Sequence, residues 1–194
     1  MRTDCMVAPL LSYGYNTPFK AFEGCTGISE HTFINVLIEC CNSLLFQGFK
    51  RIMIFSTSTD GENGIQEAAA RVCKRGEVTF CTLQKNEQFR LFCARKNNST
   101  ELWRNEWGTV ALAKSLLPKY RDIQLPTIQH PLPDKKQFKS WYKRGKDPQK
   151  LRKMIPDIRL SSFAGSITDA DAKEVMNFTV SLLLENYREF LTKF

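Results

Sequence analysis

The sequence of 194 residues lacks any apolar run close to the roughly 18–20 residues that cross a bilayer, which excludes an integral membrane protein. Its first residues lack the basic and apolar regions of a secretory signal, so we expect a cytoplasmic protein. The seven cysteines are an odd number and none forms a C-x-x-C pair, which argues against a disulfide scaffold or a zinc ribbon. We therefore expect reduced thiols, most of them in the core.

Histidine is also scarce. The two histidines are His31, in the first turn of an expected helix, and His130, next to a proline. Neither belongs to an H-E-x-x-H motif or stands near a nucleophile-elbow pattern. A Ser/His/Asp triad would have to use one of these two residues, so the sequence does not support catalysis without a metal.

Positive charge is abundant but confined to one segment. The net charge is +8, and between Lys135 and Lys153 there are nine Lys or Arg residues and a single Asp, while the rest of the chain is balanced. Phe138, Trp141 and Tyr142 are interleaved with these cations, a pattern that can bind a phosphate backbone and stack bases. Basic runs are more often solvated faces or interaction patches, so we favour an acidic partner over nucleic acid.

The order of expected elements predicts a single α/β domain over residues 1–194, with a basic insertion at about 130–156. Apolar patterning and turn residues predict strands and helices that alternate, which favours a three-layer α/β/α fold with a mostly parallel sheet. The expected strands are 6–11, 51–56, 78–83, 89–94 and 123–128, and the expected helices are 29–48, 65–74, 102–117 and 169–192, with one helical turn at 138–143.

Ligands of parallel α/β sheets bind beyond the carboxyl ends of the strands, so the loop after strand 51–56 is the first candidate site. Asp60 and Glu62 lie in this loop and are suited to a hard divalent cation. They are equally suited to the N-terminus of the next helix, where carboxylates stabilise the helix dipole. On spacing alone we favour the second interpretation.

Several segments resemble the creatininase (creatinine amidohydrolase) family. The resemblance is strongest in the first third of the chain and covers most of its length. The segments that carry it are APLLSYGYN at 8–16, FEG at 22–24, TGIS at 26–29, GFKRIMI at 48–54, EWG at 106–108, ALAKSLLP at 111–118 and GSIT at 165–168.

The resemblance implies an α/β/α fold and a metal-dependent amide hydrolase that often forms homo-oligomers. Such enzymes use two divalent ions, commonly zinc or manganese, to activate a bridging water. Glu62 matches an acidic position of the family's second ligand motif, and Asp60 replaces its histidine. Glu106 matches the glutamate of the third motif and is the candidate catalytic residue, but the histidine that should follow is Trp107.

Other positions of the family pattern also differ. The acidic position of its E-T-S motif is Leu112, and the serine is Lys114. The family's first ligand motif precedes the proline strand, and we expect it to be missing because the sequence starts only a few residues before that strand. By the same resemblance, Trp107 and the loop of Tyr13, Gly14 and Tyr15 would line the substrate pocket.

Three hypotheses follow for the function. The first is a creatininase-like domain that has lost the dinuclear site and acts as a non-catalytic or partner-dependent subunit of a homo- or hetero-oligomer, binding zinc or manganese at most weakly. The second is an amidohydrolase acting on a cyclic or linear amide, with its metal ligands completed by another chain. The third is a nucleic-acid-binding module that uses the basic aromatic segment.

Overall fold

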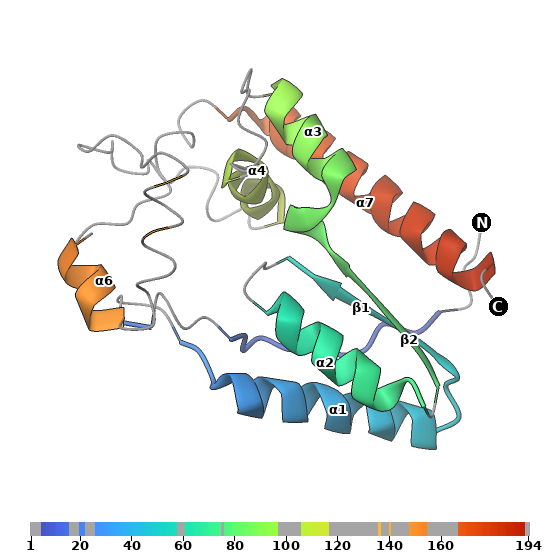
Figure 1. Cartoon of the computed structure of the whole chain (residues 1–194). Helices are drawn as coiled ribbons and strands as arrows, with labels where there is room; N and C mark the ends of the chain where they lie inside the picture. The colour runs from blue at the N-terminus through green and yellow to red at the C-terminus, as the bar shows by residue number, and fades with distance from the viewer. Residues whose placement is uncertain are drawn as a thin grey trace.

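Figure 1 shows the computed structural model of the chain, in which helices lie on both sides of a short parallel sheet. The structure describes residues 5–15, 20–21, 26–57, 61–74, 76–96, 106–116, 136, 140, 148–154 and 167–192, with only the backbone described at 106, 150, 151 and 154. Within these ranges, no helix combines the length and the hydropathy of a membrane span.

The first helix begins and ends where the sequence predicts. Helix α1 spans Glu30–Phe46, and the side chain of Ser29 accepts a hydrogen bond from the backbone N–H of Thr32 at 3.2 Å. This N-cap satisfies one of the free donors of the first turn. At the other end Gly48 has φ +96°, a conformation that glycine adopts without a steric penalty, so the chain turns there into the first strand.

Two parallel strands form the sheet in the described part of the chain. Strand β1 (Arg51–Ser56) pairs with β2 (Glu77–Thr82) in the register Arg51–Glu77 to Ser56–Thr82. Helix α2 (Glu62–Val72) connects the two strands and packs against α1. Their shared core covers one face of the sheet, and its members are Phe33, Ile34, Leu37, Ile65 and Ala68, with Ile54 and Phe80 packed against them.

A second group of helices lies on the other side of the sheet (Figure 1). After β2 the chain forms a short 3-10 helix, η1 (Leu83–Lys85), and then α3 (Glu87–Lys96), α4 (Glu106–Leu116) and α7 (Asp169–Thr192). These helices enclose a larger apolar cluster, whose buried members are Leu83, Phe89, Cys93, Trp107, Ala111, Leu112, Ile167, Val175 and Leu182. The α/β class and the parallel pairing that the sequence predicts are thus confirmed.

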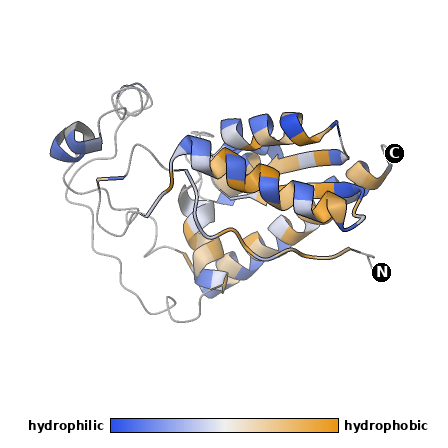
Figure 2. Cartoon of the chain, turned by 90° about the horizontal axis from the view of Figure 1, so that it is seen from below, coloured by the Kyte–Doolittle hydropathy of each residue, from blue (hydrophilic) through white to orange (hydrophobic). Residues whose placement is uncertain are grey.

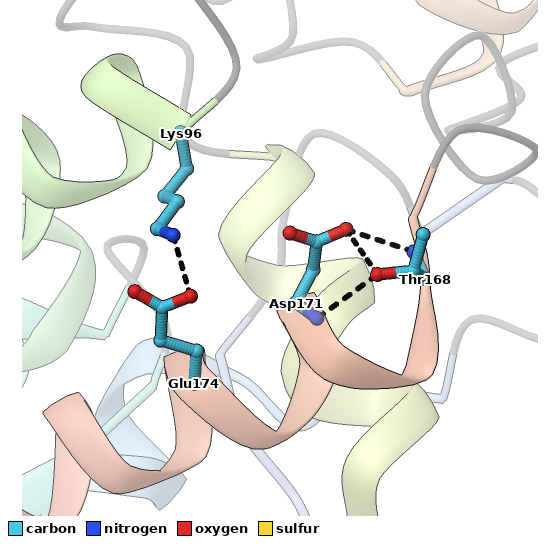
Figure 3. A network of polar contacts seen from close by, with 4 residues as sticks. All are labelled: Lys96, Thr168, Asp171 and Glu174. Carbon is cyan, nitrogen blue, oxygen red and sulfur yellow. Dashed lines mark hydrogen bonds and ion pairs between the residues drawn. The ribbon is translucent and has the colours of Figure 1, made fainter.

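Helix α7 starts with a reciprocal pair of caps, drawn in Figure 3. The hydroxyl of Thr168 accepts a hydrogen bond from the Asp171 N–H at 3.1 Å, and the Asp171 carboxylate accepts one from the Thr168 N–H at 2.9 Å. The Thr168 hydroxyl also donates to that carboxylate at 2.6 Å. One turn further on, Lys96 at the end of α3 contacts Glu174 at 2.5 Å, which joins the two helices. The predicted start of this helix at Thr168 or Asp169 is confirmed.

Residues 89–94 were expected to form a strand, and that prediction is wrong. They lie inside α3, where the side chain of Asn86 accepts a hydrogen bond from the N–H of Phe89 at 3.1 Å and starts the helix. Phe89, Phe92 and Cys93 recur three and four residues apart and face the apolar cluster. A short apolar run fits both a strand and a helix, and here the buried residues follow the helical spacing.

The predicted strand at 6–11 is also wrong. Residues 5–15 make no ladder with β1 or β2, and Figure 2 shows them as an extended, largely apolar strip that runs to the N-terminus. Met6, Val7 and Leu10 are 74%, 92% and 87% exposed. Apolar composition alone does not make a buried strand, because a strand needs a neighbour to pair with.

Smaller differences concern element bounds. Helix α2 begins at Glu62, earlier than the expected residue 65. The predicted strand 123–128 and most of the predicted turn at 138–143 lie outside the described residues. Inside the basic segment the structure describes a short helix, α6 (Pro148–Met154), which no local pattern in the sequence predicts.

Gly108 provides a test of how closely α3 and α4 pack. A Cβ atom at this position would stand 2.3 Å from the sulfur of Cys93 and 2.9 Å from the ring of Phe89. We expect Gly108→Ala to lower the free energy of unfolding by about 1–3 kcal/mol through overpacking. In an exposed helix the same change would stabilise by about 1 kcal/mol, so the sign of the effect, measured by urea denaturation, is diagnostic. Gly14→Ala is the matched control, since no atom lies within 4 Å of its added Cβ.

The cap of α7 predicts a pH dependence of stability. Hydrogen bonds from the Thr168 hydroxyl, and then from its N–H, lower the pKa of Asp171. A lowered pKa means that the carboxylate stabilises the fold above its unfolded pKa of about 4 and that this contribution is lost as the pH falls through the folded value. We expect the difference in unfolding free energy between the wild type and Asp171→Asn to shrink between about pH 6 and pH 3. Glu189→Gln, at an exposed residue of the same helix, leaves both caps in place and is the control. A difference that does not change with pH would contradict the assignment.

Candidate functional site

The carboxyl ends of both strands meet at one edge of the sheet, where Ser56 is in register with Thr82. This is the edge at which parallel α/β proteins bind ligands. The residues that follow the strands are Gly61 and Glu62 at the start of α2, and Leu83, Gln84 and Lys85 of η1. The geometry of these side chains therefore decides what this edge can bind.

Glu62 forms an ion pair at this edge. Its carboxylate oxygen Oε2 lies 2.5 Å from Nζ of Lys85, and the side chains are 15% and 51% exposed, respectively. Glu62 is in the first turn of α2, where the helix dipole also favours a negative charge. The sequence identified Glu62 as a candidate metal ligand but missed Lys85, because no local pattern connects η1 with the start of α2.

Two further polar groups come from the end of β2 and from η1. The side-chain amide of Gln84 donates a hydrogen bond to the Thr109 hydroxyl at 3.0 Å, which joins η1 to α4. Thr82 is buried, and its hydroxyl oxygen has no hydrogen-bond partner within the described residues. Threonine is a common strand residue, so nothing in the sequence distinguishes Thr82 as a member of the site.

Trp107 and Leu112 belong to the hydrophobic core. Both are buried in the cluster between α3, α4 and α7, and Trp107 is 4% exposed. Gly108 follows Trp107 and brings α4 against Phe89 and Cys93. Burial raises the pKa of the Cys93 thiol to about 12, so this cysteine stays protonated and unreactive. The ring at position 107 thus packs where the family resemblance places a polar histidine.

Lys114 also has a structural contact. Its ammonium donates a hydrogen bond to the backbone carbonyl of Ile167 at 2.7 Å and lies 3.6 Å from the carboxylate of Asp169. These contacts fasten the end of α4 to the start of α7. The position that matches the serine of the family's E-T-S motif therefore supports helix packing here.

The loop predicted to line a pocket lies beside α1. The carbonyl of Gly14 accepts a hydrogen bond from the N–H of Ile28 at 3.2 Å, within a parallel bridge between Gly14 and Gly27. Tyr15 packs against the cluster of α1 and α2, and Tyr13 is exposed. Trp107 packs in the other cluster, so the described contacts do not bring it together with this loop. The assignment of Tyr13, Gly14, Tyr15 and Trp107 to a substrate pocket stays a prediction.

Other candidate residues lie outside the described part of the structure. Asp60 is not described, and Glu106 is described only as the first residue of α4, without its side chain. Most of the segment between Lys135 and Lys153 is not described either. Within it, Lys136, Arg152 and Lys153 are exposed, and Arg152 donates a hydrogen bond to the carbonyl of Ala21 at 2.7 Å. The proposed contact of this segment with an acidic partner stays a prediction.

The described residues do not fit a dinuclear metal centre. Two divalent ions need several carboxylates or imidazoles that converge. Across the ranges that the structure describes, no three His, Cys, Asp or Glu side chains are close enough to hold a metal ion. The one matching carboxylate, Glu62, is paired with the ammonium of Lys85.

Fold and site together define a parallel α/β domain with a carboxylate–ammonium ion pair at the carboxyl edge of its sheet. The family model for creatinine amidohydrolase matches residues 1–118, well over half of the chain, and the chain belongs to this family. Members of the family are typically metal-dependent. A comparison with curated proteins found no match. The match ends before α7, so the resemblance at 165–168 and in the last helix stays a prediction.

The ion pair between Glu62 and Lys85 is tested by a double-mutant cycle. Lys85→Met keeps most of the aliphatic stem and leaves the Glu62 carboxylate without its cation. We expect it to lower the free energy of unfolding by about 1 kcal/mol, because a largely buried carboxylate loses its counter-charge. In a Glu62→Gln background the same change should cost much less.

Lys74→Met, at an exposed lysine after α2, controls for the loss of one positive charge. Equal costs of Lys85→Met in both backgrounds would mean that the two side chains do not interact in solution.

Proposed function

We propose that this chain is a creatininase-family domain that does not hold the dinuclear metal centre by itself and serves as a non-catalytic subunit. The observation that carries the proposal is the ion pair in which Lys85 Nζ lies 2.5 Å from the Glu62 carboxylate. The ammonium supplies the positive charge that this carboxylate would otherwise find in a divalent cation. A cation placed next to the ammonium would be repelled by it, which disfavours metal binding at this carboxylate.

Other positions of the family pattern support the same proposal. Trp107 and Leu112 replace polar residues of the family pattern, and both side chains are part of the core. A buried apolar side chain contributes about 1.5–3 kcal/mol to stability, so these positions serve folding. Lys114 is bonded to the carbonyl of Ile167 and is equally engaged in packing. Three positions of the family pattern, at Trp107, Leu112 and Lys114, thus have structural contacts in this chain.

A second candidate function has one observation in its favour. The Thr82 hydroxyl is buried at the carboxyl edge of the sheet without a partner in the described residues. Buried polar groups are normally hydrogen-bonded. A segment of another chain that inserts at this edge and displaces the groups covering the hydroxyl would pair with it and could also bring metal ligands, which corresponds to an amidohydrolase assembled from two chains. Metal retained by such an assembly, and not by the isolated chain, distinguishes this candidate from the first.

The metal content of the purified chain tests the proposal. The chain is incubated with excess zinc or manganese, dialysed into metal-free buffer and analysed by elemental mass spectrometry. We expect metal well below one ion per chain, because the donor set of the described residues is incomplete. The Glu62→Gln variant is measured in parallel as the matched control. Stoichiometric metal in the wild type that is absent from Glu62→Gln would overturn the proposal and favour a hydrolase.

A further inference from the structure

A basic surface is formed by two segments that lie far apart in the sequence. The guanidinium of Arg152, in α6, donates a hydrogen bond to the backbone carbonyl of Ala21 at 2.7 Å. Lys20 precedes Ala21 in a turn, Lys153 follows Arg152 in α6, and both lysines are exposed. The hydrogen bond therefore places a cation of the N-terminal part of the chain beside the cations of the basic segment.

Helix α6 stands apart from the rest of the fold. Figures 1 and 2 both show it separated from the sheet and from the helices that cover the sheet. A helix of seven residues is too short to be stable in water without further contacts, so the bond from Arg152 to Ala21 has a structural role. Within the described ranges, Lys20 and Lys153 form neither a hydrogen bond nor an ion pair, so both ammonium groups are available to a partner.

The positive charge of this surface is not balanced by its own sequence. Nine of the 28 Lys and Arg residues lie between residues 135 and 153, together with a single Asp, whereas the rest of the chain is balanced. Like charges that are gathered in one place repel one another and oppose a compact fold. A partner with negative charge would remove this repulsion, and the attraction would also speed its association.

The charges on the remaining surface favour an acidic polypeptide over a nucleic acid. Exposed carboxylates lie on helices of both layers, among them Glu39 of α1 and Glu189 of α7. A nucleic acid carries phosphates along its whole length, so a strand that ran beyond the basic surface would meet these carboxylates. An acidic segment of a protein can end where the cations end.

We propose that Lys20 and Lys153, placed side by side by the hydrogen bond from Arg152 to Ala21, belong to a docking surface for an acidic segment of a different protein. A second copy of this chain does not supply such a segment, because its sequence contains no two adjacent acidic residues. The proposal goes beyond the proposed function and does not rest on it, since it involves neither Glu62 nor a metal.

The first experiment measures binding of the full chain to a short labelled peptide rich in glutamate, by fluorescence anisotropy at increasing salt. We expect the association constant to fall steeply with salt, because salt screens exposed charges. Lys20→Glu and Lys153→Glu should each weaken binding about threefold or more, since each replaces an attraction by a repulsion. Lys74→Glu, at an exposed lysine after α2, makes the same change in net charge and should leave binding nearly unchanged. Unaltered circular dichroism would show that the variants fold.

The role of Arg152 is tested by a double-mutant cycle. Arg152→Met removes the hydrogen bond to Ala21, so Lys20→Glu should weaken binding much less in this background than in the wild type. Equal effects in both backgrounds would overturn the proposal, and so would an effect of Lys20→Glu no larger than that of Lys74→Glu. A chain that does not bind the peptide would also overturn it. Tighter binding of a single-stranded DNA with the same number of charges, at the same salt concentration, would overturn it in favour of nucleic acid.

Discussion

The parallel pairing of β1 with β2 is the constraint on which the rest of the structure depends. Parallel strands need a crossover connection, and α2 provides it on the face that α1 also covers. The chain that leaves β2 then builds the other layer from α3, α4 and α7. Because both strands end at the same edge, the residues after them are brought together there. The contact between Glu62 and Lys85 is a direct consequence of this topology.

The proposed function requires that the family scaffold is kept while the metal centre is lost. A metal centre needs polar side chains held together around a cation, and such groups are costly to bury without it. In this chain Trp107 and Leu112 lie in the core, and Lys85 neutralises Glu62. The contacts of these residues stabilise packing between neighbouring elements and require no bound ion. On the proposed function, these positions of the family pattern serve stability and not metal binding.

Local signals predict much of the fold. Ser29 caps the start of α1, and Gly48 ends this helix in a left-handed turn. Thr168 starts α7 through its hydroxyl. The two strands follow from short apolar runs between turn residues. A run of six apolar and polar residues fits the two-residue period of a strand as well as the 3.6-residue period of a helix, so the sequence does not separate α3 from a strand. The hydrogen bond from the Phe89 N–H to the Asn86 side chain, which starts the helix, is visible only in the structure.

The candidate site was less predictable, for a physical reason. Glu62 was found because it follows a strand and matches a family motif, whereas its partner Lys85 comes from a different element and is brought near only by the crossover. The burial of Trp107 likewise depends on α7, which comes much later in the chain. Contacts between distant segments have no local pattern, so their chemistry becomes visible only once the helices are packed.

The central claim is that the positive charge at Glu62 is the ammonium of Lys85 and not a divalent cation. Anomalous diffraction from crystals of the chain soaked in zinc would test this claim most directly. The account predicts no anomalous peak within coordination distance of the Glu62 carboxylate, and Lys85 Nζ in contact with Oε2. One or two strong peaks at the carboxyl edge of β1 and β2, with Lys85 displaced, would contradict it.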